Sequence, residues 1–110
     1  MKRLVWIGSS REDLKGMRQD VMDELGYELY KLQCGNDPLD FKPMPSVGKG
    51  VYEIRIRDEN NKNTIRCFYL AKLKDKICVL HCFIKKTEQT SKKDIEIGKK
   101  RYSEAIKNES

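Results

Sequence analysis

The sequence lacks any long apolar run. No stretch approaches the roughly 18–20 consecutive apolar residues that a membrane-spanning helix needs. The apolar run near the N-terminus, Leu4–Ile7, is shorter than the apolar region of a secretory signal peptide. We therefore expect neither a membrane protein nor an exported one. The length of 110 residues suits a single domain over residues 1–110, which we expect in the cytoplasm.

Histidine is also scarce, since His81 is the only one. One histidine gives little scope for a Ser-His-Asp triad, and no segment matches the phosphate-binding loop GxxxxGK[ST]. A metal-dependent nuclease needs several converging carboxylates, but few accompany the basic segments described below. They are Glu53, Asp58, Glu59 and Asp75. We predict no cofactor.

The four cysteines do not form a recognisable metal motif. Cys78 and Cys82 are separated by three residues in an apolar run, and a regular strand would place them on one face, about 13 Å apart. Metal-binding pairs usually have two intervening residues on a tight turn. Disulfides are rare in the cytoplasm. We predict no metal site, and expect most of these thiols to pack as small apolar groups.

Positive charge is concentrated in the second half of the chain. The net charge is +6 and the isoelectric point is near 9.2. Residues 1–48 contain seven basic and eight acidic side chains, whereas residues 49–110 contain sixteen basic and nine acidic ones. A one-sided basic domain favours a polyanionic partner such as RNA or the ribosome.

The N-terminal half has the pattern of a strand followed by helices. Residues 3–7 predict a strand. Ser10 and Asp13 then have capping-box spacing, and Gly16 predicts a break between two helices. A loop is predicted over residues 34–50, which contain three prolines and several glycines. The helical stripe, spaced by three or four residues, comprises Leu14, Met17, Val21, Leu25, Leu29 and Leu32.

The C-terminal half predicts three strands and a helix. Residues 51–57, 64–73 and 77–85 are the strands, joined by turns at 58–63 and 74–76. In the first of them Tyr52, Ile54 and Ile56 share one face, and Glu53, Arg55 and Arg57 share the other. Ser91 and Asp94 mark a helix start, followed by an apolar stripe at Ile95, Gly98, Tyr102 and Ile106.

The predicted element order is β-α-α-β-β-β-α. Consecutive strands joined by short turns are antiparallel. The expected fold is therefore α+β, with a small antiparallel sheet flanked by helices.

Basic side chains are predicted to meet on this sheet. A hairpin turn at residues 58–63 brings Arg66 close to Arg55 or Arg57, and Lys85-Lys86 ends the next strand. Like charges this close repel unless an anion lies between them, and guanidinium groups suit phosphate. RNA carries its own nucleophile, the 2′-hydroxyl, so its cleavage needs no metal. A solvated basic sheet face remains the alternative.

The motifs GKGVYEIRIRD, IRCFYL and VLHCFIKKTEQTSKKDIEIGKKR, in this order, resemble RelE/HigB-type toxins of type II toxin–antitoxin modules, in the phage-derived branch. The upstream segment ELGYELYKLQCGNDPLDFKPM is similar as well, so the resemblance spans residues 3–106. It implies the RelE-like fold and a metal-independent endoribonuclease that cleaves mRNA on the ribosome and inhibits translation. It also implies a helix-turn-helix antitoxin of the HigA type as partner, and an oligomer with that antitoxin.

The resemblance carries functional positions onto this chain. The catalytic candidates are Arg55, Arg66, Lys85 and Lys86, with Lys86 favoured for proton transfer. The phosphate- or RNA-binding candidates are Lys49, Arg57, Thr87, Lys92 and Lys93. Two features depart from RelE: Glu53 replaces a lysine, and no aromatic residue follows at Thr87–Thr90. A non-catalytic RNA- or ribosome-binding module of the same fold is the alternative function.

Overall fold

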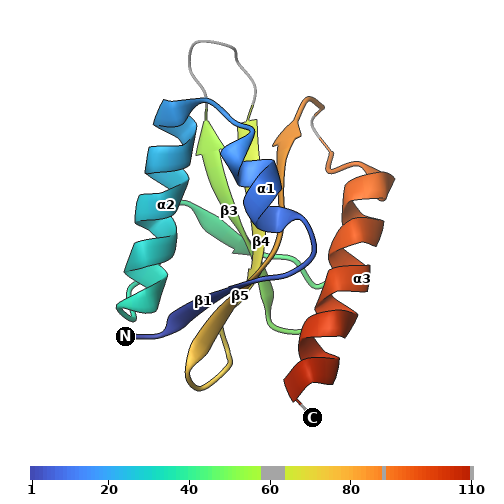
Figure 1. Ribbon diagram of the computed structural model, residues 1–110. Helices are drawn as coiled ribbons and strands as arrows, with labels where there is room; N and C mark the ends of the chain where they lie inside the picture. The colour runs from blue at the N-terminus through green and yellow to red at the C-terminus, as the bar shows by residue number, and fades with distance from the viewer. Residues whose placement is uncertain (58–63, 88, 110) are drawn as a thin grey trace.

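The computed structural model describes residues 1–57, 64–87 and 89–109, in which a five-stranded sheet carries helices on both faces (Figure 1). This arrangement confirms the predicted α+β class. The predicted turn at residues 58–63 lies outside the described residues. No helix among the described residues is long and apolar enough to cross a membrane. The elements are β1 (Arg3–Trp6), α1 (Ser10–Lys15), α2 (Gln19–Gln33), β2 (Phe41–Pro43), β3 (Val51–Arg57), β4 (Thr64–Leu70), β5 (Lys76–Lys85) and α3 (Lys92–Glu109).

The sheet is mixed rather than wholly antiparallel. Its strand order is β1-β5-β4-β3-β2. The strands β3, β4 and β5 pair antiparallel in turn, as predicted, and β2 pairs antiparallel with β3, but β1 pairs parallel with β5. A parallel pair needs a long crossover, and α1 to β4 supply it. The prediction from short turns did not extend to β1, which is joined to β5 only through this crossover.

The edge strand β2 was missed by the prediction of a continuous loop at residues 34–50. Phe41 pairs with Ile54 and Lys42 pairs with Glu53 of β3. Proline is tolerated in an edge strand because its missing N–H leaves no ladder bond unmade, so Pro43 does not prevent the pairing. As a result, β2 brings Lys42 to the same sheet face as Glu53.

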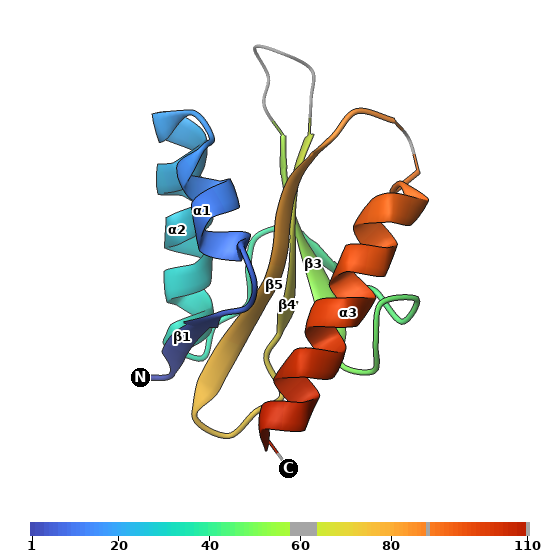
Figure 2. The ribbon, with the colours of Figure 1, turned by 45° about the vertical axis from the view of Figure 1, so that its right-hand side comes forward.

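Two apolar layers hold the helices on the sheet (Figure 2). The helices α1 and α2 cover one face, and the predicted stripe of α2, including Leu25 and Leu29, packs there against all three long strands. The helix α3 covers the other face, over Phe68 and Leu80. The predicted α3 stripe needs one correction, because Ala105 is buried whereas Ile106 is 40% exposed.

A bulge in β5 changes which of its side chains face α3. Phe68 pairs with His81 while the next residue of β4, Tyr69, pairs with Val79, so β5 contains one extra residue, Leu80. An extra residue reverses the alternation of all later side chains. Consequently Cys78 packs on the α3 side and Cys82 on the α1/α2 side. The prediction that these two cysteines share a face was wrong.

The two predicted helix starts differ. At α3, the Asp94 amide donates to Ser91 Oγ at 3.1 Å and Ser91 Oγ donates to Asp94 Oδ2 at 2.6 Å, so the predicted cap forms. At α1 the residue that precedes the helix is Ser9. The hydroxyl of Ser10, which is completely buried, donates instead to the Val79 carbonyl at 3.0 Å. The second serine thus joins α1 to β5 rather than capping α1.

Gly98 marks a close approach of α3 to the sheet, and Gly98→Ala should test it. A Cβ there would lie 2.8 Å from Phe68 Cδ2 and 3.0 Å from Val47 Cγ1. We expect overpacking to outweigh the better helix propensity of alanine and to lower the free energy of unfolding by about 1–3 kcal/mol. Urea denaturation measures the change. Gly26→Ala in α2 is the matched control, because a Cβ there meets nothing within 4 Å, and it should stabilise by about 0.5–1 kcal/mol. Equal effects of both changes would contradict the close approach.

Candidate functional site

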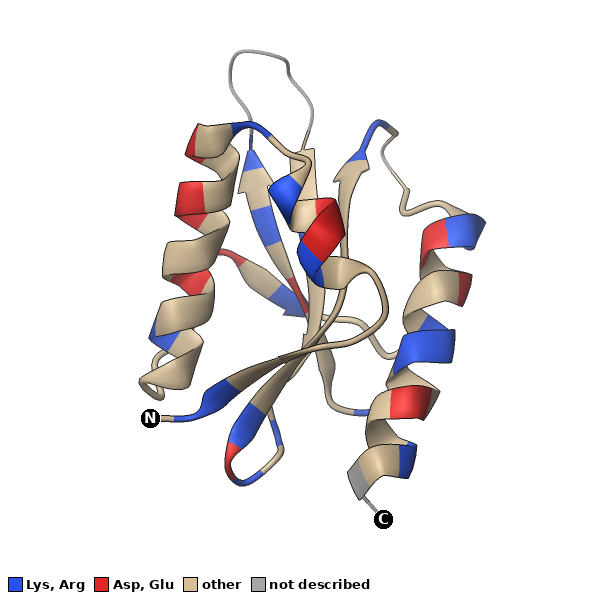
Figure 3. Cartoon of the chain, in the orientation of Figure 1, with Lys and Arg blue, Asp and Glu red and all other residues tan. Residues whose placement is uncertain are grey.

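Basic residues lie along β3 and at the end of β5 (Figure 3), and Arg66 shares the α3 face of the sheet with Phe68, two residues further along β4. Arg55 lies directly opposite Arg66, and Lys85 lies opposite Thr64 on the same strand as Arg66. Cross-strand partners and alternate residues share a face, so these side chains project on one side. We call Lys42, Arg55, Arg66 and Lys85 the basic face.

Glu53 lies beneath the basic face and is 0% exposed. Its Oε1 is 3.3 Å from Arg66 Nε and 3.8 Å from Lys42 Nζ. Neither carboxylate oxygen, nor Arg66 Nε, makes a hydrogen bond within the described part of the chain. Burial raises the pKa of Glu53, and the neighbouring cations only partly offset this. Glu53 is therefore a buried counter-charge that positions Arg66 and is out of reach of a ligand.

The remaining charges leave the basic face electropositive. Arg55 Nε lies 3.0 Å from Asp40 Oδ1 in a partly exposed ion pair, which is a weak interaction in water. Burial first, and then Arg66, lowers the pKa of Lys85. Among the described residues, the carboxylates that form ion pairs with these four cations are those of Glu53 and Asp40. Such an arrangement suits an anion with several acceptor oxygens.

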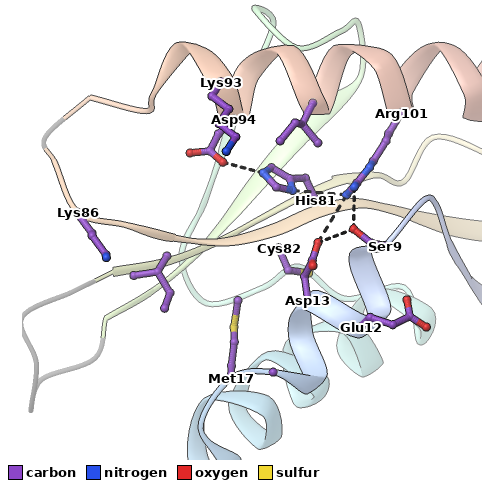
Figure 4. Close-up of a pocket in the computed structure, with 13 residues that line it drawn as sticks. Ser9, Glu12, Asp13, Met17, His81, Cys82, Lys86, Lys93, Asp94 and Arg101 are labelled. Atoms are coloured by element: carbon purple, nitrogen blue, oxygen red, sulfur yellow. Dashed lines mark hydrogen bonds and ion pairs between the residues drawn. The ribbon is translucent and has the colours of Figure 1, made fainter.

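A second feature is a cleft of about 670 Å³ between α1 and α3, across β5 (Figure 4). We call it the α1–α3 cleft. Its position differs from that of the basic face, because the bulge sends Cys82, Ile84 and Lys86 away from the side of Lys85. The lining residues are Ser9, Glu12, Asp13, Gly16, Met17, His81, Cys82, Ile84, Lys86, Lys93, Asp94, Ile97 and Arg101.

A hydrogen-bonded network fixes one wall of the α1–α3 cleft. His81 Nε2 lies 2.8 Å from Asp94 Oδ1, and Arg101 Nη1 lies 3.5 Å from His81 Nδ1. Because arginine only donates, Nδ1 accepts and Nε2 carries the proton that it donates to Asp94. Arg101 also donates to Ser9 Oγ at 2.9 Å, and Ser9 Oγ donates to Asp13 Oδ2 at 2.9 Å.

The network gives His81 a packing role. Its ring stacks on Phe83, with 4.6 Å between centroids, and burial lowers its pKa despite the contact with Asp94. Both ring nitrogens face partners in α3. His81 is thus the packed, hydrogen-bonded strand histidine that joins β5 to α3.

The cysteines show no sign of a metal centre. The four cysteines are not joined in disulfides, and Cys67, Cys78 and Cys82 are buried whereas Cys34 is exposed. Within residues 1–57, 64–87 and 89–109, no group of three or more His, Cys, Asp or Glu side chains is placed to hold a metal ion. The hydrogen bond with Cys82, and then burial, raise the pKa of Cys67 well above its usual value, which makes that thiol unreactive.

A family model described as phage-derived protein Gp49-like (DUF891) matches residues 12–103. The chain belongs to this family. Gp49-like proteins belong to the RelE/toxin-like superfamily, and the observed sheet with flanking helices is consistent with the RelE-like fold. No curated protein matches the chain. The matched residues include the whole basic face and most of the α1–α3 cleft.

In this Gp49-like protein the predicted catalytic residues separate into two groups. Arg55, Arg66 and Lys85 meet on the basic face, and Arg57 is exposed at the end of β3. Lys86 instead lines the α1–α3 cleft, together with Lys93. The prediction had placed Lys85 and Lys86 at one site, and the alternation of β5 is the physical reason that they part.

The other predicted binding residues are dispersed over the surface of the Gp49-like protein. Thr87, beyond β5, donates from Oγ1 to the Gln89 carbonyl at 2.7 Å. Lys92 is exposed at the start of α3. Lys49 precedes β3, and its carbonyl accepts a hydrogen bond from the Tyr102 hydroxyl at 3.1 Å. The structure therefore leaves Lys49 at the end of β3 opposite to Arg57.

The sequence analysis did not identify Lys42, which belongs to the basic face, or Asp40, which pairs with Arg55. Both lie in the segment that was predicted to be a loop. The sequence feature that could have indicated an edge strand is the succession of an apolar and a basic residue at Phe41 and Lys42. These two residues lie opposite Ile54 and Glu53 of β3. Three nearby prolines obscured it.

Proposed function

We propose that this Gp49-like protein is the toxin of a toxin–antitoxin module, and that it is a metal-independent endoribonuclease cleaving mRNA on the ribosome. The observation that carries the proposal is the direct cross-strand pairing of Arg55 with Arg66, flanked by Lys42 and Lys85. Opposed like charges destabilise a sheet unless they bind an anion. Guanidinium forks fit the oxygens of a phosphate group.

The reaction would use the 2′-hydroxyl of RNA as nucleophile. Its oxygen would bond to the adjacent phosphorus as the bond from phosphorus to the 5′-oxygen breaks, which gives a 2′,3′-cyclic phosphate and a 5′-hydroxyl that takes its proton from water. Arg55 and Arg66 would stabilise the charge that grows on the phosphate. Lys85 is the better candidate for accepting the 2′-hydroxyl proton, because its pKa is lowered by burial and by Arg66, and a lowered pKa gives a larger fraction of free amine at neutral pH. The role that the sequence assigned to Lys86 passes in this proposal to Lys85.

The proposed partners follow from the same charges and from the family. RNA and the ribosome present phosphate to the basic face. Membership of a toxin-like superfamily favours a neutralising antitoxin, for which we propose a helix-turn-helix protein of the HigA type.

A non-catalytic RNA- or ribosome-binding module is the second candidate function. One observation favours it. Glutamate and histidine are the side-chain types that most often act as general acid or base, but Glu53 and His81 are both buried and held by other side chains. Phosphate contacts alone position a protein on RNA without chemistry.

Induced expression in bacteria, with mapping of RNA ends in the presence and absence of ribosomes, tests the proposal. We expect growth arrest and ribosome-dependent cleavage from the unchanged protein, and neither from Arg55→Ala combined with Lys85→Ala. The matched control is Arg11→Ala with Lys15→Ala, which removes the same charges from exposed positions of α1. Arrest by all three forms without RNA cleavage would favour the binding module. Equal cleavage by all three forms would refute the assigned site.

A further inference from the structure

The α1–α3 cleft contains two lysines that the fold leaves without a partner. Lys86 at the end of β5 and Lys93 in the first turn of α3 both line it. Among the described residues, neither makes an ion pair or a side-chain hydrogen bond. By contrast, Asp13 and Asp94 in the same lining are held by Arg101, Ser9 and His81. These two lysines therefore bring positive charge to the cleft that no carboxylate among the described residues pairs with.

The floor of the α1–α3 cleft is apolar. Ile84 is 44% exposed, an unusual exposure for a large apolar residue in a strand, and it lines the cleft with Met17 and Ile97. In Figure 4, Lys86 lies at one end of the cleft and Glu12 at the other. A ligand that fits has an anionic end, a flat apolar body and hydrogen-bond donors at its far end.

The size and position of the cleft indicate which class of ligand it can bind. A volume of about 670 Å³ is within the usual range for pockets that bind small molecules. Lys85 and Lys86 are consecutive, about 3.3 Å apart along the strand, and project to opposite sides of β5. A polyanion held on the basic face can therefore pass over the end of β5 and reach Lys86.

We propose that the α1–α3 cleft binds one nucleotide of the RNA strand, with its phosphate at Lys86 and Lys93 and its base against Ile84 and Met17. This inference rests on the proposed function, in which the basic face holds the neighbouring phosphate. Glu12 is placed to accept hydrogen bonds from the amino group of a base. The network through His81 and Arg101 holds the two helices apart at a fixed width, so the site exists before the ligand arrives.

The single histidine provides a direct measurement. The His81 ring signals in NMR spectra of the whole protein should shift saturably on titration with adenosine 5′-monophosphate. Lys86→Gln with Lys93→Gln should weaken this binding by about tenfold, because two partly exposed ion pairs are lost. Lys74→Gln with Lys100→Gln removes two exposed lysines outside the cleft and should leave the binding within about twofold.

A second pair of variants tests the base. Ile84→Ser should weaken binding of the nucleotide but not of inorganic phosphate, whereas Ile106→Ser, at a similarly exposed position on α3, should change neither. The proposal is overturned if the four 5′-mononucleotides leave His81 unshifted, or if phosphate binds as tightly as the nucleotides. It is also overturned if an acidic peptide displaces an RNA oligonucleotide of equal charge equally well.

The experiments on the α1–α3 cleft can be distinguished from the test of the proposed function. RNA cleavage on the ribosome without a nucleotide-induced shift of His81 would refute the cleft alone. Saturable nucleotide binding that depends on Lys86 and Lys93, in a protein that cleaves no RNA, would support the cleft and refute the endoribonuclease.

Discussion

Arg66→Lys should lower the rate of RNA cleavage by about 100-fold while leaving the free energy of unfolding almost unchanged. Losing one donor aimed at the charge that develops in a transition state typically costs about 10²–10³ in rate. Lysine keeps a cation next to Glu53 but loses the planar fork that binds two phosphate oxygens together. The change therefore separates the catalytic role of Arg66 from its part in the buried ion pair with Glu53.

Single-turnover cleavage of mRNA in programmed ribosomes measures the rate, and urea denaturation measures the stability. Arg11→Lys is the matched control, because Arg11 is exposed on α1, and it should cleave at the unchanged rate. A rate for Arg66→Lys within about threefold of the unchanged protein would exclude Arg66 as the principal stabilising group, since the expected loss is at least thirty times greater.

The two strands that bring Arg55 and Arg66 to the basic face were predictable from the alternation of their neighbours and the short hairpin between them. Ile54, Ile56 and the arginines between them alternate with a period of two, and a short hairpin must place Arg66 near Arg55 whatever the turn. The sequence left open whether Arg55 or Arg57 is the neighbour of Arg66, and the observed register places Arg55 directly opposite it. The same holds for α2, whose apolar stripe has a helical period and packs where that period indicated.

The bulge in β5, the edge strand β2 and the α1–α3 cleft could not be predicted, because they depend on pairing between distant segments of the chain. The bulge at Leu80 is invisible in an apolar run in which every residue suits either face, yet it determines that Lys85 and not Lys86 joins Arg66. The edge strand β2 has only three residues, and its pairing with β3 exists because the tertiary fold brings it there. The α1–α3 cleft depends on the crossover that lays β1 beside β5, so its members come from three separate parts of the chain.

Glu53→Gln is expected to remove a pH dependence of stability. The pKa of Glu53 in the folded protein is raised from 4.5, chiefly by burial. Between the unfolded and the folded value the native protein binds more protons than the unfolded chain, so stability falls as the pH rises through this window. Glutamine has no charge to bury, and the difference between the two proteins should grow from about pH 4.5 upwards and then level off. Urea denaturation from pH 4 to pH 8 measures it, and a difference that does not vary with pH would contradict the burial of a titrating carboxylate.

Arg66→Ala should enlarge the same pH dependence, because Arg66 is the nearest cation to Glu53 and lowers its pKa. Removing the nearest cation leaves Glu53 with Lys42 at 3.8 Å as its remaining ion-pair partner, and breaking a buried pair from one side costs about 3–5 kcal/mol. That loss should be largest at pH 8 and should diminish at low pH, where Glu53 becomes protonated and needs no partner. Combining Glu53→Gln with Arg66→Ala should recover most of the stability, because neither charge is then left alone in the interior. If the double variant is instead as unstable as the two single effects added together, Arg66 and Glu53 are not coupled, and the basic face is positioned by something other than its buried carboxylate.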